Sequence, residues 1–158
     1  PRDYAAPGNQ DPFTPWPDSV VLASAIAART SRIRIALSAL ILPLRHPLHT
    51  ATQLATLDLL AEGRLIVQPT VSWLDEEYAA MGVPFERRGR ILDEQLEILK
   101  LVWSTSPASF DGEFHSFRDV HVEPKCWRPE GPRMWFGGQH VHGPIRSPTR
   151  AATLRTSR

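Results

Sequence analysis

Hydroxyl groups and paired glycines are the parts of this sequence that could contact a ligand. Thr70 and Ser72 follow an apolar segment, and their hydroxyls could bind an anion together with backbone N–H groups at the start of a following helix. The alternative is an ordinary loop from strand to helix in which Ser72 caps the helix. The pair Gly137-Gly138 follows another apolar segment, but turns use such pairs so often that it is a weak signal alone.

The histidines do not form a recognisable metal-binding pattern. His46 and His49 are three positions apart, and His140 and His142 are two positions apart. Neither pair has a third ligand at a spacing that is typical of a metal site, so we predict none.

Three other reactive side chains have structural interpretations. Glu76 and Glu77 could act as general acid and base, but they more simply form the exposed first turn of a short helix, where the helix dipole favours acids. Cys126 has no nucleophile partner in the sequence and is expected to be structural. A single cysteine excludes an internal disulfide and fits a reducing compartment, so we expect a cytoplasmic protein.

The pattern of apolar residues indicates helices that alternate with strands. Asp18 is placed to cap the first helix, and Pro47 fits the first turn of the second. The expected helices cover residues 20–28, 47–62, 74–81 and 86–103, and the expected strands cover 32–42, 64–67 and 133–136. Residues 110–114 predict a hairpin with Asp111-Gly112 as its turn. Strands separated by helices indicate an α/β fold with a parallel sheet.

Two details of the strands can be tested against a structure. Residues 32–42 are almost continuously apolar, which predicts a strand that is buried on both faces, as in a parallel sheet. The next strand is expected to end at Pro69, because proline has no N–H group for a ladder hydrogen bond.

Composition limits the possible partners. The chain has 158 residues, of which 42% are hydrophobic and 22% are charged, as in soluble globular domains. Its net charge of +1 gives no reason to expect a nucleic-acid or membrane-surface partner. No apolar run reaches the roughly 20 residues of a membrane-spanning helix. We expect an N-terminal loop at 1–17, one domain at 18–142 and a basic, disordered tail at 143–158.

Four segments in this order resemble the luciferase-like family of flavin- and deazaflavin-dependent oxidoreductases. They are RIRIALSALILPLRHP, QLATLDLLAEGRLIV, WLDEEYAAMGVPFERRGRILDEQLEILKLVW and WFGG, within residues 18–142. The resemblance implies a (β/α)8 TIM barrel that binds FMN or the deazaflavin F420 at the C-terminal ends of its strands. Such a barrel takes about 250 residues. We therefore expect a partial barrel, about half of the whole, in a truncated chain that starts after the second barrel strand.

The resemblance also implies which residues bind the cofactor. Ser38 and Ala39 would form a strand bulge with a non-prolyl cis peptide against the flavin ring; otherwise they are simply two small residues packed inside a barrel. Gly137 and Gly138 would offer backbone N–H groups to the cofactor phosphate. His46 would lie close to the cofactor edge.

Thr70 and Ser72 occupy the loop that approaches the phosphate side of the cofactor in the family. Many relatives have a glycine-rich turn here, which lets the backbone approach the cofactor closely. Residues 68–73 of this chain contain no glycine, so the hydroxyls would have to take over that contact.

The implied function is hydride transfer between reduced F420 or FMN and a small organic substrate. We place F420 first because the segment around Ser38 and Ala39 looks most like F420-type members, and FMN is the alternative, including a monooxygenase that uses FMNH2 and O2. No catalytic residue can be named. The other hypothesis is a non-catalytic barrel remnant. Its open sheet edges would favour self-association, for example as a homodimer.

Overall fold

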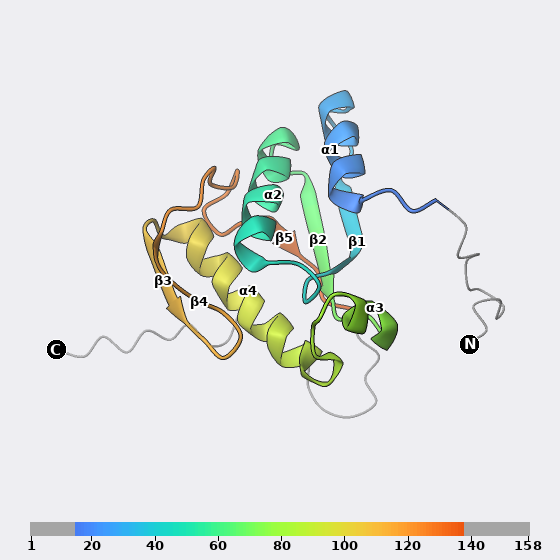
Figure 1. Ribbon diagram of the computed structural model, residues 1–158. Coiled ribbons are helices and arrows are strands. Elements are labelled where there is room, and N and C mark those ends of the chain that lie inside the picture. Colours follow the sequence, from blue (N-terminus) through green and yellow to red (C-terminus); the bar gives the residue numbers. More distant parts are fainter. Residues whose placement is uncertain (1–14, 138–158) are drawn as a thin grey trace.

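The computed structural model describes residues 15–137 as a parallel sheet covered by helices, with a separate hairpin (Figure 1). The elements are α1 (Ser19–Arg29), β1 (Ile35–Ile41), α2 (Pro47–Leu60), β2 (Leu65–Thr70), α3 (Asp75–Ala80), a 3-10 turn (Phe85–Arg87), α4 (Arg88–Ser104), β3 (Ala108–Asp111), β4 (Ser116–Val120) and β5 (Arg133–Met134). The predictions for residues 1–14, Gly138, the histidines at 140 and 142 and the basic tail lie outside the described residues.

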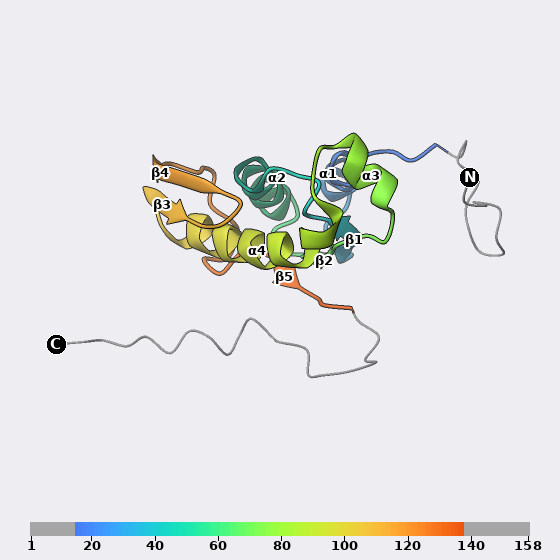
Figure 2. The same cartoon turned by 60° about the horizontal axis from the view of Figure 1, so that its bottom comes forward.

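The three strands β1, β2 and β5 form one parallel sheet in that order, and this confirms the predicted α/β alternation. Ser38 of β1 lies opposite Gln68 of β2, and Ile66 of β2 lies opposite Arg133 of β5. Figures 1 and 2 show α1 and α2 on the same side of the sheet, and α4 packs next to α2. The core therefore lies between one face of the sheet and this layer of helices.

Strand β1 is buried on one face only, so the prediction of burial on both faces is wrong. Ile35, Leu37 and Leu40 are at most 6% exposed and belong to the core, whereas Ala36 and Ser38 are exposed. Helices cover one face of the sheet. Within residues 15–137 the side chains of β1 on the other face are exposed, although Ile66 of β2 on that face is only 3% exposed. We call this second face the open face. In a closed barrel it would line the interior.

The helix starts follow the expected chemistry. The Oδ1 atom of Asp18 accepts hydrogen bonds from the N–H groups of Val20 and Val21 at 2.9 and 3.0 Å, as predicted for an N-cap. Pro47 is the first residue of α2, also as predicted.

Pro69 does not end β2, which continues to Thr70. Pro69 lies opposite Leu40, next to the point where the β1 register shifts. A bulge already interrupts the ladder there, so the missing N–H group of proline is tolerated inside the strand.

The predicted hairpin is present as the antiparallel pair β3 and β4, but its connection is longer than an Asp-Gly turn. Residues 112–115 join the strands, and Gly112 N–H donates to the carbonyl of His115 at 3.0 Å. The Glu94 carboxylate of α4 accepts hydrogen bonds from the N–H groups of Glu113 and Phe114 at 2.6 and 3.0 Å. His115 Nδ1 lies 2.8 Å from the same carboxylate. One acid thus fixes the loop on α4.

We expect Glu94→Gln to lower the free energy of unfolding by about 1–3 kcal/mol, because hydrogen bonds to a charged acceptor are lost and an amide N–H2 group is brought toward N–H donors. Urea unfolding followed by circular dichroism measures the change. Asp93→Asn, which alters the exposed acid at the preceding position of α4, is the matched control and should change stability little.

The difference in stability between wild type and Glu94→Gln should depend on pH. Burial opposes ionisation of Glu94, but hydrogen bonds from Phe114, His115 and Glu113 outweigh it and hold the pKa of the carboxyl below its usual value. Stability from such a group is present above its unfolded-state pKa and is lost as pH falls through the folded-state pKa. The difference between wild type and Glu94→Gln should therefore shrink below about pH 4. An equal difference at pH 7 and pH 3 would contradict this role of the charge.

No helix within residues 15–137 is both long and apolar enough to cross a membrane.

Candidate functional site

Strand β1 bulges at Ser38 and Ala39. The register shifts between Ser38 and Leu40, so two consecutive side chains, Ser38 and Ala39, are exposed instead of alternating with buried ones. The peptide bond between Ser38 and Ala39 is cis. The bulge and the cis bond that the resemblance implied are therefore both present, while their contact with a flavin stays a prediction.

Gln68 of β2 is the polar partner of this bulge. The Ser38 hydroxyl donates a hydrogen bond to Oε1 of Gln68, which lies directly opposite in the sheet. Gln68 was missed as a site residue at the sequence level. The available signal was a single amide side chain inside the apolar segment LIVQPT, two positions before Thr70.

Gly137, which follows the third strand β5, lies beside the Gln68 side chain. A Cβ atom at Gly137 would lie 2.5 Å from Nε2 of Gln68, closer than real contacts allow, so the glycine backbone and the amide are in direct proximity. Ser38, Gln68 and Gly137 come from or directly follow β1, β2 and β5, three neighbouring strands. The sheet thus gathers two of the predicted segments around one amide side chain.

Thr70 and Ser72 form their hydrogen bonds outside this cluster. Thr70 ends β2, and its carbonyl accepts a hydrogen bond from Leu42 N–H at 3.3 Å. Ser72 adopts a positive φ of 58°, and its hydroxyl donates to Glu77 Oε2 at 3.2 Å and accepts from Leu74 N–H at 3.4 Å. The Ser72 hydroxyl is therefore hydrogen-bonded to α3 and to the residue that precedes it.

The start of α3 does not favour an anion. Leu74, not Ser72, occupies the N-cap position, and the first turn carries the three acids Asp75, Glu76 and Glu77. This confirms the placement of Glu76 and Glu77 in a first helical turn. Their negative charges would repel a phosphate group at this end of the helix.

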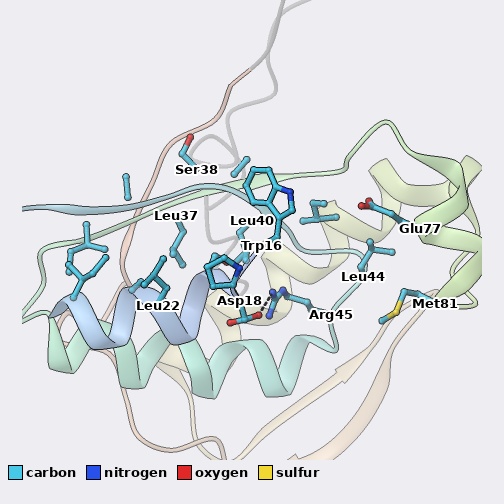
Figure 3. A pocket seen from close by; sticks show the side chains of 18 of the residues that line it. Trp16, Asp18, Leu22, Leu37, Ser38, Leu40, Leu44, Arg45, Glu77 and Met81 are labelled. Carbon is cyan, nitrogen blue, oxygen red and sulfur yellow. Dashed lines mark hydrogen bonds and ion pairs between the residues drawn. The ribbon is translucent and has the colours of Figure 1, made fainter. Parts of the chain in front are cut away.

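An open cavity of about 1030 Å³ runs along the free edge of β1 (Figure 3). It is lined mainly by apolar side chains of α1 and β1 and of the segments that precede α1 and follow α3, among them Trp16, Leu22, Leu40 and Met81, and it includes Ser38 and Ala39. The cavity therefore reaches the bulge, and its apolar walls suit a small organic ligand.

An ion pair closes one side of this cavity. Arg45 Nη2 lies 2.9 Å from Oδ2 of Asp18 (Figure 3). The pKa of Asp18 is held below its usual value by the N–H group of Val21 and by Arg45. Asp18 is therefore ionised at neutral pH, and the pair links the start of α1 to the loop after β1.

His46 and Cys126 were the remaining reactive side chains considered from the sequence, and the place of His46 near a cofactor stays a prediction. His46 is the N-cap residue of α2, and its ring lies 5.9 Å from the ring of His115. Burial and the neighbouring histidine lower the pKa of His46. No group of potential metal ligands occurs among residues 15–137. Cys126 is buried, and burial together with the charge of Asp58 raises the pKa of its thiol to about 12, so little reactive thiolate exists at neutral pH.

A parallel sheet with crossover helices, a bulged strand and polar groups gathered across three strands defines part of a (β/α)8 barrel. The family model of luciferase-like monooxygenases matches residues 4–149, and the chain belongs to this family.

Relatives and solved structures agree with this assignment. The chain is 40% identical over 119 residues to an uncharacterized protein of Mycobacterium tuberculosis, covering 75% of this chain and 40% of the relative. It is 32% identical over 124 residues to an FMNH2-dependent dimethylsulfone monooxygenase of Pseudomonas putida, covering 77% and 34%. The crystal structure of the monooxygenase RslO1 from Streptomyces bottropensis matches with a TM-score of 0.72 and 32% identity, covering 76% and 36%. The chain thus spans about 40% or less of these relatives.

Proposed function

We propose that this chain forms the flavin-binding part of a monooxygenase that uses reduced FMN and O2 to oxidise a small organic molecule. The observation that carries the proposal is the cluster of Ser38, Gln68 and Gly137 on the open face of the sheet. Membership of the luciferase-like monooxygenase family and the FMNH2-dependent relative support it.

The open face suits a flat aromatic ring. Ala36, Ser38 and Ala39 present only small, exposed side chains. A planar ring can approach these small side chains of β1 closely. The adjoining apolar cavity at the β1 edge offers room for a small substrate.

Gln68 is the residue that would orient the ring. Its Oε1 atom already accepts the hydrogen bond from Ser38, which leaves the Nε2 hydrogens as donors. Those donors can reach a ring carbonyl or nitrogen, and Ser38 fixes the rotation of the amide. The reduced flavin, when bound, supplies the electrons that activate O2. The residues of this chain supply orientation and exclusion of water.

The phosphate group of the cofactor needs binding residues other than those that contact the ring. Ser72 is engaged with Glu77, and the acids of α3 oppose an anion. We therefore assign the phosphate to backbone N–H groups of Gly137 and Gly138, of which Gly138 lies outside the described residues. Thr70, at the end of β2, remains a candidate through its hydroxyl.

We expect FMN to bind more tightly than F420, which reverses the order favoured by the sequence. The basis is the dimethylsulfone monooxygenase, whose name specifies FMNH2. Anaerobic titration of the purified chain with reduced FMN and, separately, with reduced F420 measures both affinities by fluorescence. At least about tenfold tighter binding of FMN is expected. Saturable binding of F420 alone would overturn the choice of cofactor, and binding of neither would overturn the proposal.

A further inference from the structure

A second, strongly basic cavity lies at the other end of the same strands. It has a volume of about 220 Å³, and five arginines line it together with one glutamate, Glu62. The arginines are Arg32, Arg34, Arg64, Arg128 and Arg133. Arg34 directly precedes β1, Arg64 directly precedes β2, and Arg133 begins β5. Because the strands are parallel and adjacent, their amino ends bring these residues together.

The positive charge of this arginine cavity is only partly neutralised within residues 15–137. Arg32, Arg34 and Arg133 are exposed and form no ion pair with the acids of this part of the chain. Five arginines and one carboxylate line the cavity, and Asp58 lies close enough to Arg128 for their charges to interact, so positive charge remains in excess. Like charges at this density repel one another, and a bound anion would relieve that repulsion.

Arg64 holds the wall of the cavity in place. Its two terminal nitrogens donate to the carbonyls of Thr30 and Ile33 at 2.7 and 2.9 Å, where the chain leaves α1. Its Nε atom is buried and has no partner in the structure. The guanidinium is thus fixed at the edge of the cavity.

Arg128 offers a second buried donor without a partner. Its Nη1 atom is buried and makes no hydrogen bond. Its Nη2 atom would lie 3.3 Å from a Cβ atom at Gly63, so the guanidinium packs against the turn before β2. An unpaired buried donor costs about 1–3 kcal/mol, and a charged one costs more.

We propose that the arginine cavity binds a doubly charged oxyanion, either free phosphate or the phosphate group of a small monoester. Several guanidinium donors around a small volume, one of them held in place by backbone carbonyls, match the several acceptor oxygens and the charge of phosphate. Chloride offers neither the charge nor the geometry. The site is separate from the proposed flavin site, because the arginine cavity lies at the amino ends of the strands, the Ser38 bulge lies in the middle of β1, and the two sites share no lining residue.

The test is a titration of the full chain with inorganic phosphate and, in a second arm, with glycerol 3-phosphate, at constant ionic strength set with sodium chloride. Backbone amide signals in nuclear magnetic resonance spectra report the position of binding. Saturable shifts around Gly63, Arg64 and Arg133 are expected. Equal affinities of the two probes indicate a free oxyanion, and tighter binding of the second indicates a monoester. The absence of saturable shifts there overturns the proposal.

Two variants and one control test whether phosphate binds specifically in the arginine cavity. Arg133→Gln and Arg128→Gln should each weaken phosphate binding at least about tenfold, because each removes a charged donor. Arg133 is exposed at the start of β5, so its replacement should leave the fold intact even if Arg128→Gln does not. Arg118→Gln, an exposed arginine on the hairpin outside the cavity, should leave the affinity unchanged. Equal losses in all three variants would indicate non-specific attraction and overturn the site.

Competition with flavin provides an independent readout. Saturating phosphate should leave the affinity for FMN unchanged, because none of the residues that line the arginine cavity belongs to the proposed flavin site. Displacement of FMN by phosphate would show that the anion occupies the cofactor site instead, and it would overturn the assignment to the arginine cavity.

Discussion

Replacement of Gly131 with alanine should lower the free energy of unfolding by about 2–5 kcal/mol. Gly131 has a φ of 88°, where a residue with a side chain is strained by about 1–2 kcal/mol. An added Cβ atom would also lie 2.4 Å from Cε3 of Trp103. Trp103 is 2% exposed and donates through its indole N–H to the carbonyl of Ala51 at 3.1 Å, so the ring cannot move without further loss. Overpacking of this kind adds about 1–3 kcal/mol.

Urea unfolding followed by circular dichroism measures the effect of Gly131→Ala. The matched control is Gly89→Ala in the first turn of α4, where an added Cβ atom meets nothing within 4 Å. This control should be neutral or stabilising by up to about 1 kcal/mol, because alanine favours helix more than glycine. Stability of Gly131→Ala within about 0.5 kcal/mol of wild type would show that the contact with Trp103 is not as described.

Ala39→Leu should weaken binding of reduced FMN at least about 100-fold, the second large effect. Ala39 is exposed at the bulge, where it lines the cavity beside Ser38. A leucine there would project into the space in front of the open face and keep a planar ring from the amide of Gln68. Because the site is exposed, the thermal unfolding temperature should change little.

Anaerobic fluorescence titration of Ala39→Leu beside wild type measures the loss of affinity. Ala28→Leu places the same larger side chain at an exposed position of α1 that does not line the cavity, and it should bind FMN like wild type. Unchanged affinity in Ala39→Leu would remove the bulge from the cofactor site. A loss in both variants would indicate that the effect is not local.

The sequence was sufficient for the order of helices and strands because each carries its own signal. Asp18 and Pro47 mark helix starts, and apolar runs mark β1 and β2. It was misleading for the faces of β1, since apolar residues occur on both faces while helices cover only one. Which face is covered depends on elements far away in the sequence, and local composition does not contain that information.

The candidate site was predictable in part. The bulge at Ser38 and Ala39 and the position of Gly137 followed from the family resemblance. Gln68 was missed because its meaning depends on register: only the pairing of β1 with β2 places it opposite Ser38. The arginine cavity was missed for the same reason, since its residues come from turns and strand starts that only the sheet brings together.

The most direct test of the proposed flavin site is an anaerobic titration with reduced FMN. Nuclear magnetic resonance spectra then follow the backbone and side-chain amide signals. The account predicts saturable shifts at Ser38, Ala39 and Gly137 and at the side-chain amide of Gln68, with the hairpin β3–β4 unaffected. Saturable binding whose shifts leave these four residues unchanged would contradict it, as would the absence of any saturable shift from a chain that is folded by circular dichroism.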